Sequence, residues 1–228
     1  MKKAMDITHN KSFWDNKYSN NDTGWDIGSP STPLKEYIDQ IQNKNIKILI
    51  PGCGNSYEAE YLLDSGFSDI TLIDIADKPI SLLRQTFKDR KEIHIVHGDF
   101  FKLSGQYDLI LEQTFFCAID PSLRSEYVNH AISLLNPNGK LAGVMFNCDF
   151  NKEGPPYGGN LEEYKKLFEE QFVIRTMTPC YNSIPPRSGN EVFIIFEKAW
   201  DCLLLQLFFI LKSDCHTSYF NILDIFIK

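Results

Sequence analysis

Short apolar runs alternate with amphipathic stretches along most of the chain, which predicts strands that alternate with helices. The runs predicted as strands lie at residues 46–50, 69–75, 93–96, 107–111, 140–146, 172–177 and 191–197. Apolar residues between the runs recur at helical spacing, as Ile80, Leu83 and Phe87 do. This order predicts an α/β fold, a doubly wound and mostly parallel sheet with helices on both faces. The last two strands have no helix between them, so we expect an antiparallel strand at one edge.

The starts of two helices can be predicted from capping residues. Asn55 with Glu58 three positions later matches a capping box. Asp120-Pro121 supplies an N-cap followed by a proline at the first helical position. Further helices are predicted over residues 34–41 and 161–170.

With 228 residues, 43% of them hydrophobic, the chain can bury the core of one α/β domain, which we place at residues 34–200. Residues 1–33 are polar with spaced aromatic residues and end in a turn-rich stretch. Residues 201–228 form an apolar extension, whose run at 202–211 is too short to span a bilayer. A core helix, a partner-binding helix and an extension without function all fit it.

The charge argues against two kinds of partner. The formal net charge is -7 and no cluster of lysine and arginine occurs, so neither nucleic acid nor an anionic membrane surface is expected. No secretory signal opens the chain, and no Cys-x-x-Cys pair is present, so we expect a cytoplasmic protein with reduced cysteines. The cysteines are at positions 53, 117, 148, 180, 202 and 215. No metal site is expected, because His94 and His97 would point to opposite faces of a strand.

The stretch ILIPGCGNSYEAEYL, at residues 48–62, has the order strand, glycine turn, helix that holds nucleotide-like ligands. A phosphate-binding P-loop is excluded, because no Gly-Lys-Ser/Thr follows. A dinucleotide site usually has a third glycine where this chain has Asn55-Ser56-Tyr57, so that reading is weakened.

Carboxylates follow the next strands. Asp74, 20 positions after Gly54, can accept the hydroxyls of a ribose. Asp99 can accept the amine of an adenine that stacks on Phe100. Glu112 ends the fourth strand, and we expect it to face the same crevice and help to bind the cofactor. Several carboxylates would repel a pyrophosphate but tolerate a sulfonium cation, so the ligand that fits is S-adenosylmethionine.

Several segments resemble those of thiopurine S-methyltransferases, and within that family the thiol and halide methyltransferase branch. They are Trp14, Tyr18, Trp25-Asp26-x-Gly28, IPGCG, LIDIA, GDFF, FFCAIDPSLR and EGPPY, and the resemblance covers about residues 12 to 198. It implies a cytosolic class I methyltransferase with a Rossmann-like, seven-stranded sheet whose last strand is antiparallel. The methyl donor would be S-adenosylmethionine.

The same resemblance implies roles for individual residues. Trp14, Tyr18 and Trp25 match a segment, within residues 1–33, that closes over the cofactor. Gly52 and Gly54 match the turn under its methionine portion. The ribose acid is matched by Asp74, the adenine site by Asp99 and Phe100, and the acid of the fourth strand by Glu112.

The acceptor site is where this chain departs from the family. Gln113 replaces the tyrosine of the halide branch and the arginine of thiopurine enzymes, and Phe146 stands in place of a tyrosine, whereas Tyr157 is retained. We expect Gln113 to orient the acceptor as a catalytic residue together with Tyr157, while Trp25 and Phe146 line the substrate pocket. A small thiol or hydrosulfide is the expected acceptor, with halide and thiopurine as alternatives. A thiol needs no dedicated base, because part of it is already thiolate at neutral pH.

Two other classes stay open. An NAD-dependent oxidoreductase is disfavoured by the missing third glycine. A non-catalytic module that binds an adenosyl ligand would bind the cofactor without transferring methyl. The sequence gives no indication of the oligomeric state.

Overall fold

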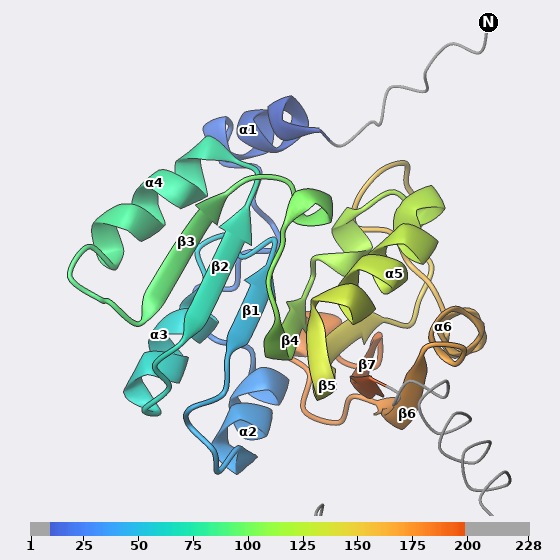
Figure 1. Cartoon of the computed structure of the whole chain (residues 1–228). Coiled ribbons are helices and arrows are strands. Elements are labelled where there is room, and N and C mark those ends of the chain that lie inside the picture. The colour runs from blue at the N-terminus through green and yellow to red at the C-terminus, as the bar shows by residue number, and fades with distance from the viewer. Residues whose placement is uncertain (1–9, 199–228) are drawn as a thin grey trace, which may run out of the picture. The chain divides into compact units, whose positions relative to one another are not determined.

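A computed structural model describes residues 10–198, which fold around one seven-stranded sheet (Figure 1). The spatial order of the strands is β3-β2-β1-β4-β5-β7-β6. Their bounds are β1 Ile48–Pro51, β2 Ile70–Asp74, β3 Ile93–His97, β4 Tyr107–Gln113, β5 Leu135–Phe146, β6 Phe172–Pro179 and β7 Glu191–Lys198. The predicted α/β class and the seven strands are therefore confirmed.

Strands β1 to β5 pair in parallel, whereas β7 pairs antiparallel with both β5 and β6. The predicted antiparallel pair thus lies at one edge of the sheet. Within it, β7 is the strand that runs against the other six, and β6 is outermost. The order reverses at β1, where β2 lies on one side and β4 on the other, and ligands of doubly wound sheets bind at such a switch point.

Helices cover both faces of the sheet because successive strand residues point to opposite sides. In β1, Ile48 and Ile50 pack under α2 (Thr32–Gln40), α3 (Tyr57–Asp64) and α4 (Asp77–Thr86). Leu49, between them, belongs to the core under α5 (Arg124–Leu134) and α6 (Leu161–Phe168). Burial on both faces explains why the parallel strands read as continuous apolar runs.

The structure differs from the sequence-based prediction at two places. Residues Lys11–Ser19 form a helix, α1, that the sequence pattern did not predict. The N-cap of α3 is Ser56, in a left-handed conformation, and not Asn55. Asn55 instead donates from Nδ2 to the carboxylate of Asp26.

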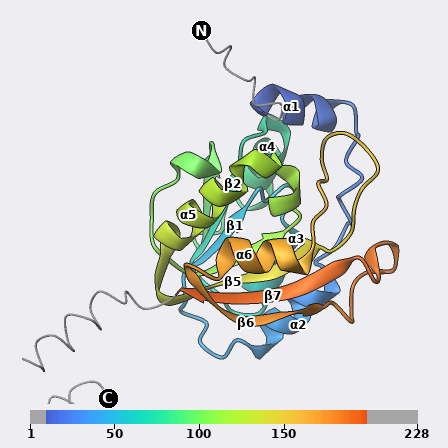
Figure 2. The same cartoon turned by 90° about the vertical axis from the view of Figure 1, so that its right-hand side faces the viewer.

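Asp120 caps a short 3₁₀ turn, Pro121–Leu123, by accepting from Ser122 N, and α5 begins directly after it. Similar 3₁₀ turns, η1 (Phe100–Lys102) and η2 (Phe116–Ala118), follow β3 and β4, and a further one, η4 (Pro185–Arg187), precedes β7. The first two lie beyond the carboxyl ends of their strands. In two views at right angles, α1 lies at the same end of the sheet (Figure 2). Within residues 10–198, no helix combines the length and the apolarity that a membrane crossing requires.

Candidate active site

Two cavities lie where the strands end at the switch point. The large cavity has a volume of about 630 Å³, within the range of small-molecule sites. The small cavity has a volume of about 60 Å³ and lies over the glycine turn. Both are lined by Tyr18, Trp25, Gly52 and Thr114. The two spaces therefore adjoin along these residues.

The glycine turn is shaped by backbone angles that side chains disfavour. Gly52 has φ +54°, and a Cβ atom there would lie 2.2 Å from Cδ2 of Phe115. Phe115 can pack on the turn only because position 52 is glycine. Thr114, which lines both cavities, is itself held at φ 61°, an unusual angle for a residue other than glycine. Both predicted glycines, Gly52 and Gly54, line the small cavity.

One side of the large cavity, the β2–β3 half, is formed by residues at and after the carboxyl ends of those two strands, among them Asp74, Asp99 and Phe100. Asp74 is 9% exposed and accepts from the amides of Gly54 and Ala76, each at 2.9 Å. Burial raises the pKa of Asp74. Phe100 is 4% exposed and stacks on Tyr127, so only a small part of its ring reaches the cavity. Asp99 accepts from the amide of Phe101 at 3.0 Å.

The other side, the β5–β7 half, is formed by Phe146, Phe150, Lys152, Pro156, Arg187 and Asn190. Here Arg187 is 9% exposed, and Cζ of its guanidinium lies 5.8 Å from the ring centroid of Phe146. Its Nη1 lies 3.5 Å from the carboxylate of Glu191, which is also buried. This half is apolar with cations at its wall, whereas the β2–β3 half contains two carboxylates.

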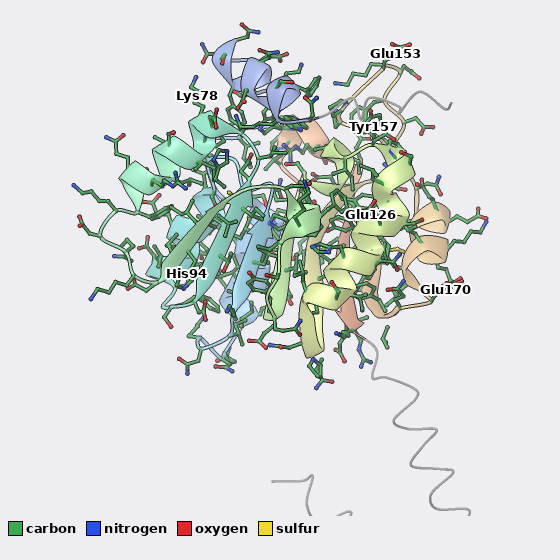
Figure 3. The ribbon with its side chains drawn as sticks, turned by 45° about the horizontal axis from the view of Figure 1, so that its top comes forward. Lys78, His94, Glu126, Glu153, Tyr157 and Glu170 are labelled. Atoms are coloured by element: carbon green, nitrogen blue, oxygen red, sulfur yellow. The ribbon has the colours of Figure 1, made fainter. Side chains whose placement is uncertain are left out.

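The N-terminal segment contributes aromatic residues to the walls of both cavities. Trp25 makes edge contacts with Trp14 and Tyr18, with ring centroids 5.5 and 5.6 Å apart. Trp14 lines the large cavity, and Trp25 lines both. Lys78 on α4 donates to the carbonyl of Tyr18 at 2.9 Å, beside α1 (Figure 3). These contacts fix the aromatic residues over the glycine turn.

Gln113, at the end of β4, lines the small cavity and is absent from the wall of the large one. Its Oε1 accepts from the hydroxyl of Ser31 at 2.9 Å. The amide of Ser31 donates to Glu58 at 3.1 Å, and burial raises the pKa of Glu58. The sequence-based expectation placed Gln113 at the acceptor, but its neighbours here are the glycine turn and the start of α3.

Glu112 does not face the crevice, contrary to the sequence-based expectation. Its side chain is 1% exposed, and Oε1 accepts from the amides of Phe115 and Phe116, each at 2.8 Å. Oε2 accepts from the Tyr127 hydroxyl at 2.7 Å. Burial raises the pKa of Glu112 to about 7. The residue holds the turn after β4, and that turn lines the large cavity.

Tyr157 is half-buried on the loop after β5 and donates its amide to the carbonyl of Cys117 at 2.7 Å (Figure 3). Its neighbours Pro155 and Pro156 line the large cavity, but Tyr157 does not. Phe146, expected in the substrate pocket, does line it.

Four cysteines lie in the described part of the chain, and all have free thiols. Cys53 and Cys117 are buried, which raises the pKa of both thiols. Packing, and not reactivity, is therefore the role that their surroundings favour. Cys202 and Cys215, like the rest of the apolar extension, lie outside the described residues.

Sequence reasoning missed several residues of the site. Arg187 was not singled out, because a lone arginine in the segment PPRSGN carries no motif. Ser31 and Glu58 lie far apart in sequence, and only the fold brings them to Gln113. Asp26 was recognised only as part of Trp25-Asp26-x-Gly28, and its bond to Asn55 could not be read from spacing.

Solved structures share this fold. The 1,6-didemethyltoxoflavin-N1-methyltransferase of Burkholderia thailandensis, crystallised with bound 1,6-didemethyltoxoflavin and S-adenosylhomocysteine, matches with a TM-score of 0.69. The match covers 83% of this chain and 87% of that one, at 16% identity. A methyltransferase of Methanosarcina mazei matches with a TM-score of 0.60, over 76% and 100% of the two chains, at 17% identity. The fold is thus that of the class I methyltransferases.

The sequence narrows the assignment further. The profile of the thiopurine S-methyltransferase family matches residues 9–202, and the chain belongs to this family. The probable thiol methyltransferase 2 of Arabidopsis thaliana is 28% identical, over 78% of this chain and 81% of its own length. A thiopurine S-methyltransferase of Acinetobacter baylyi is 25% identical, over 78% and 93%. A thiocyanate methyltransferase of Brassica oleracea is 25% identical, over 83% and 86%.

Proposed function

We propose that this enzyme transfers the methyl group of S-adenosylmethionine to a small sulfur nucleophile, a thiol or hydrosulfide. The observation that supports it best is the junction of the two cavities at Trp25 and Thr114. A cofactor that extends from the β2–β3 half into the small cavity would place its sulfur at this junction. The β5–β7 half would then receive the acceptor.

The residues present fit this cofactor. The Oγ atom of Ser56 is buried and has no hydrogen-bond partner within residues 10–198, and Ser56 lines the small cavity. Asp74 uses its oxygens for two backbone amides, but each carboxylate oxygen has a second lone pair for a ribose hydroxyl. Asp99, with Phe100 at its side, would hold the adenine. Trp14, Tyr18 and Trp25 would cover the cofactor.

When bound, S-adenosylmethionine supplies an electrophilic methyl group on a sulfonium. The protein must hold the nucleophile in line with that group and exclude water, and positioning of this kind can lower a barrier by ~7–11 kcal/mol. Trp25 closes the junction from the N-terminal side, and its indole can face a cationic sulfonium. Both cavities therefore share the residue best suited to cover the reacting centre.

The β5–β7 half favours an anionic nucleophile with little need for polar recognition. Lys152 contributes positive charge to its wall, Arg187 contributes a guanidinium that is paired with Glu191, and Phe146 and Phe150 make the wall apolar. A cation near the acceptor favours its thiolate form, so the reaction needs no general base. Relatives named for thiol and thiocyanate methyl transfer agree with a sulfur acceptor. The enzyme is proposed to act in the cytoplasm, because thiols stay reduced there.

Acceptor kinetics test this proposal. Purified enzyme with methyl-labelled S-adenosylmethionine is offered hydrosulfide, aliphatic and aromatic thiols, thiocyanate, iodide and a thiopurine. The proposal predicts the highest kcat/KM for a thiol or hydrosulfide, with methylthio products. A highest kcat/KM for iodide or the thiopurine would contradict the proposed acceptor, and so would cofactor binding without transfer to any of them.

A further inference from the structure

Gln113 lines the small cavity, and the oxygen of its side-chain amide is already hydrogen-bonded. Its Oε1 accepts from Ser31 Oγ, and Nε2 has no hydrogen-bond partner in the part of the chain that the structure describes. Ser31 is itself 3% exposed and tied to Glu58 through its amide. Ser31 thus fixes the orientation of the Gln113 amide, and Nε2 is a donor available to a ligand in that cavity.

The other polar groups of the small cavity include both negative and positive ones. Asp26 and Glu58 bring carboxylates to its wall. The start of α3, an eight-residue helix, brings the positive end of a helix dipole, and its N-cap Ser56 has a buried hydroxyl without a partner within residues 10–198. A ligand with both a carboxylate and an ammonium group matches this wall. At about 60 Å³ the cavity suits such a small polar group and not an aromatic ring.

We infer that Gln113 is a specificity-determining residue for the amino-acid end of the cofactor, and not for the methyl acceptor. Nε2 donates to the carboxylate of that end, and Ser31 is the positioning residue that orients the amide. The ammonium group lies toward the carboxylates of Glu58 and Asp26. This inference rests on the proposed cofactor, but not on the proposed acceptor.

Two ligands that differ in the amino-acid end can show whether Gln113 binds that end of the cofactor. S-adenosylhomocysteine has the amino-acid end, whereas methylthioadenosine has the same nucleoside and a thioether but lacks it. Calorimetric titration of Gln113→Leu should show S-adenosylhomocysteine binding weakened about tenfold or more, since a hydrogen bond to a charged group is lost. Binding of methylthioadenosine should change less than about twofold. Ser31→Ala should show the same selectivity with a smaller loss.

Gln85→Leu, the same substitution at an exposed position of α4, is the matched control and should leave both affinities unchanged. Should Gln113→Leu fail to fold, Gln113→Met keeps the length of the side chain without the donor and should give the same result. Equal weakening of both ligands, or of neither, would overturn the inference. So would an altered KM for the acceptor at saturating cofactor with S-adenosylhomocysteine affinity intact. Failure of every acceptor in a transfer assay would contradict the proposed function and leave this comparison of ligands valid.

Discussion

The carbonyl oxygen of Trp25 accepts a hydrogen bond of 2.9 Å from Nη2 of Arg187, although 162 positions separate the two residues. This bond joins the N-terminal segment to the loop between β6 and β7. Trp25 lines both cavities, and Arg187 lines the β5–β7 half of the large one. The residue that covers the junction is therefore held by the wall of the proposed acceptor side.

Replacing Arg187 with Met should lower the free energy of unfolding by about 3–5 kcal/mol, because it leaves buried Glu191 without its cation. Urea unfolding measures the change. The double variant Arg187→Met/Glu191→Gln should regain part of the loss, since the unpaired charge is gone. Arg175→Met is the control, because Arg175 forms an exposed ion pair with Glu197 and should cost less than about 1 kcal/mol. A double variant no more stable than the single one would refute this explanation.

Asp74→Asn should weaken S-adenosylhomocysteine binding at least about tenfold, because the charged acceptor for the ribose is lost. The amide oxygen of Asn can accept from only one of the two backbone amides that Asp74 binds, so the turn loses one hydrogen bond and keeps the other. Calorimetry measures the affinity. Asp108→Asn is the control, since Asp108 also accepts from a backbone amide, that of Lys47 at 2.8 Å, but lines neither cavity. If both variants lost the same affinity for S-adenosylhomocysteine, the loss would come from a disturbed fold and not from a missing contact with the ribose.

Glu112 should make stability depend on pH. Its pKa is about 7 in the folded protein against an ordinary 4.5, so between these values the folded chain holds a proton that the unfolded chain has lost. Stability contributed by this group is present below about pH 4.5 and falls as pH rises toward 7, by up to about 1.4 kcal/mol per unit. Urea unfolding from pH 5 to 8 should show this slope in the wild type and a smaller slope in Glu112→Gln, in which the pKa values of Asp74 and Glu58 are still raised. Identical slopes would show that Glu112 does not titrate in this range.

Phe146→Leu should act on the acceptor alone. The smaller side chain removes apolar contact worth about 1 kcal/mol, which predicts an acceptor KM raised about fivefold for a thiol with an apolar body. The affinity for S-adenosylhomocysteine should stay within about twofold, because Phe146 does not line the small cavity. Steady-state kinetics and calorimetry on the same preparation give both values. If the variant lost affinity for the cofactor alone, Phe146 would contact the cofactor and not the acceptor, which would contradict this assignment.

Much of the fold could be predicted because buried parallel strands are apolar on both faces and glycines mark the turn. Ile48, Leu49 and Ile50 carry that signal without help from distant residues. Helix α1 escaped prediction because its polar residues bind partners on other elements, as Lys11 and Asp15 bind Asp77. The local pattern of apolar and polar residues does not indicate contacts between residues that are far apart in the sequence.

The site could be predicted only in part, for the same reason. Strand ends located Asp74 and Asp99, because residues that end parallel strands meet at one edge of the sheet. The position of a residue in the strand does not predict that Glu112 is buried in the core while Gln113 lines the small cavity. Those directions depend on the turn after β4, which Glu112 itself holds through two backbone amides.

Calorimetric titration of the purified protein with S-adenosylhomocysteine, and separately with NADH, tests the central claim most directly. We predict saturable binding of S-adenosylhomocysteine with one ligand per chain, and no heat of binding from NADH. Binding of NADH by folded protein that ignores S-adenosylhomocysteine would contradict the account and favour an oxidoreductase.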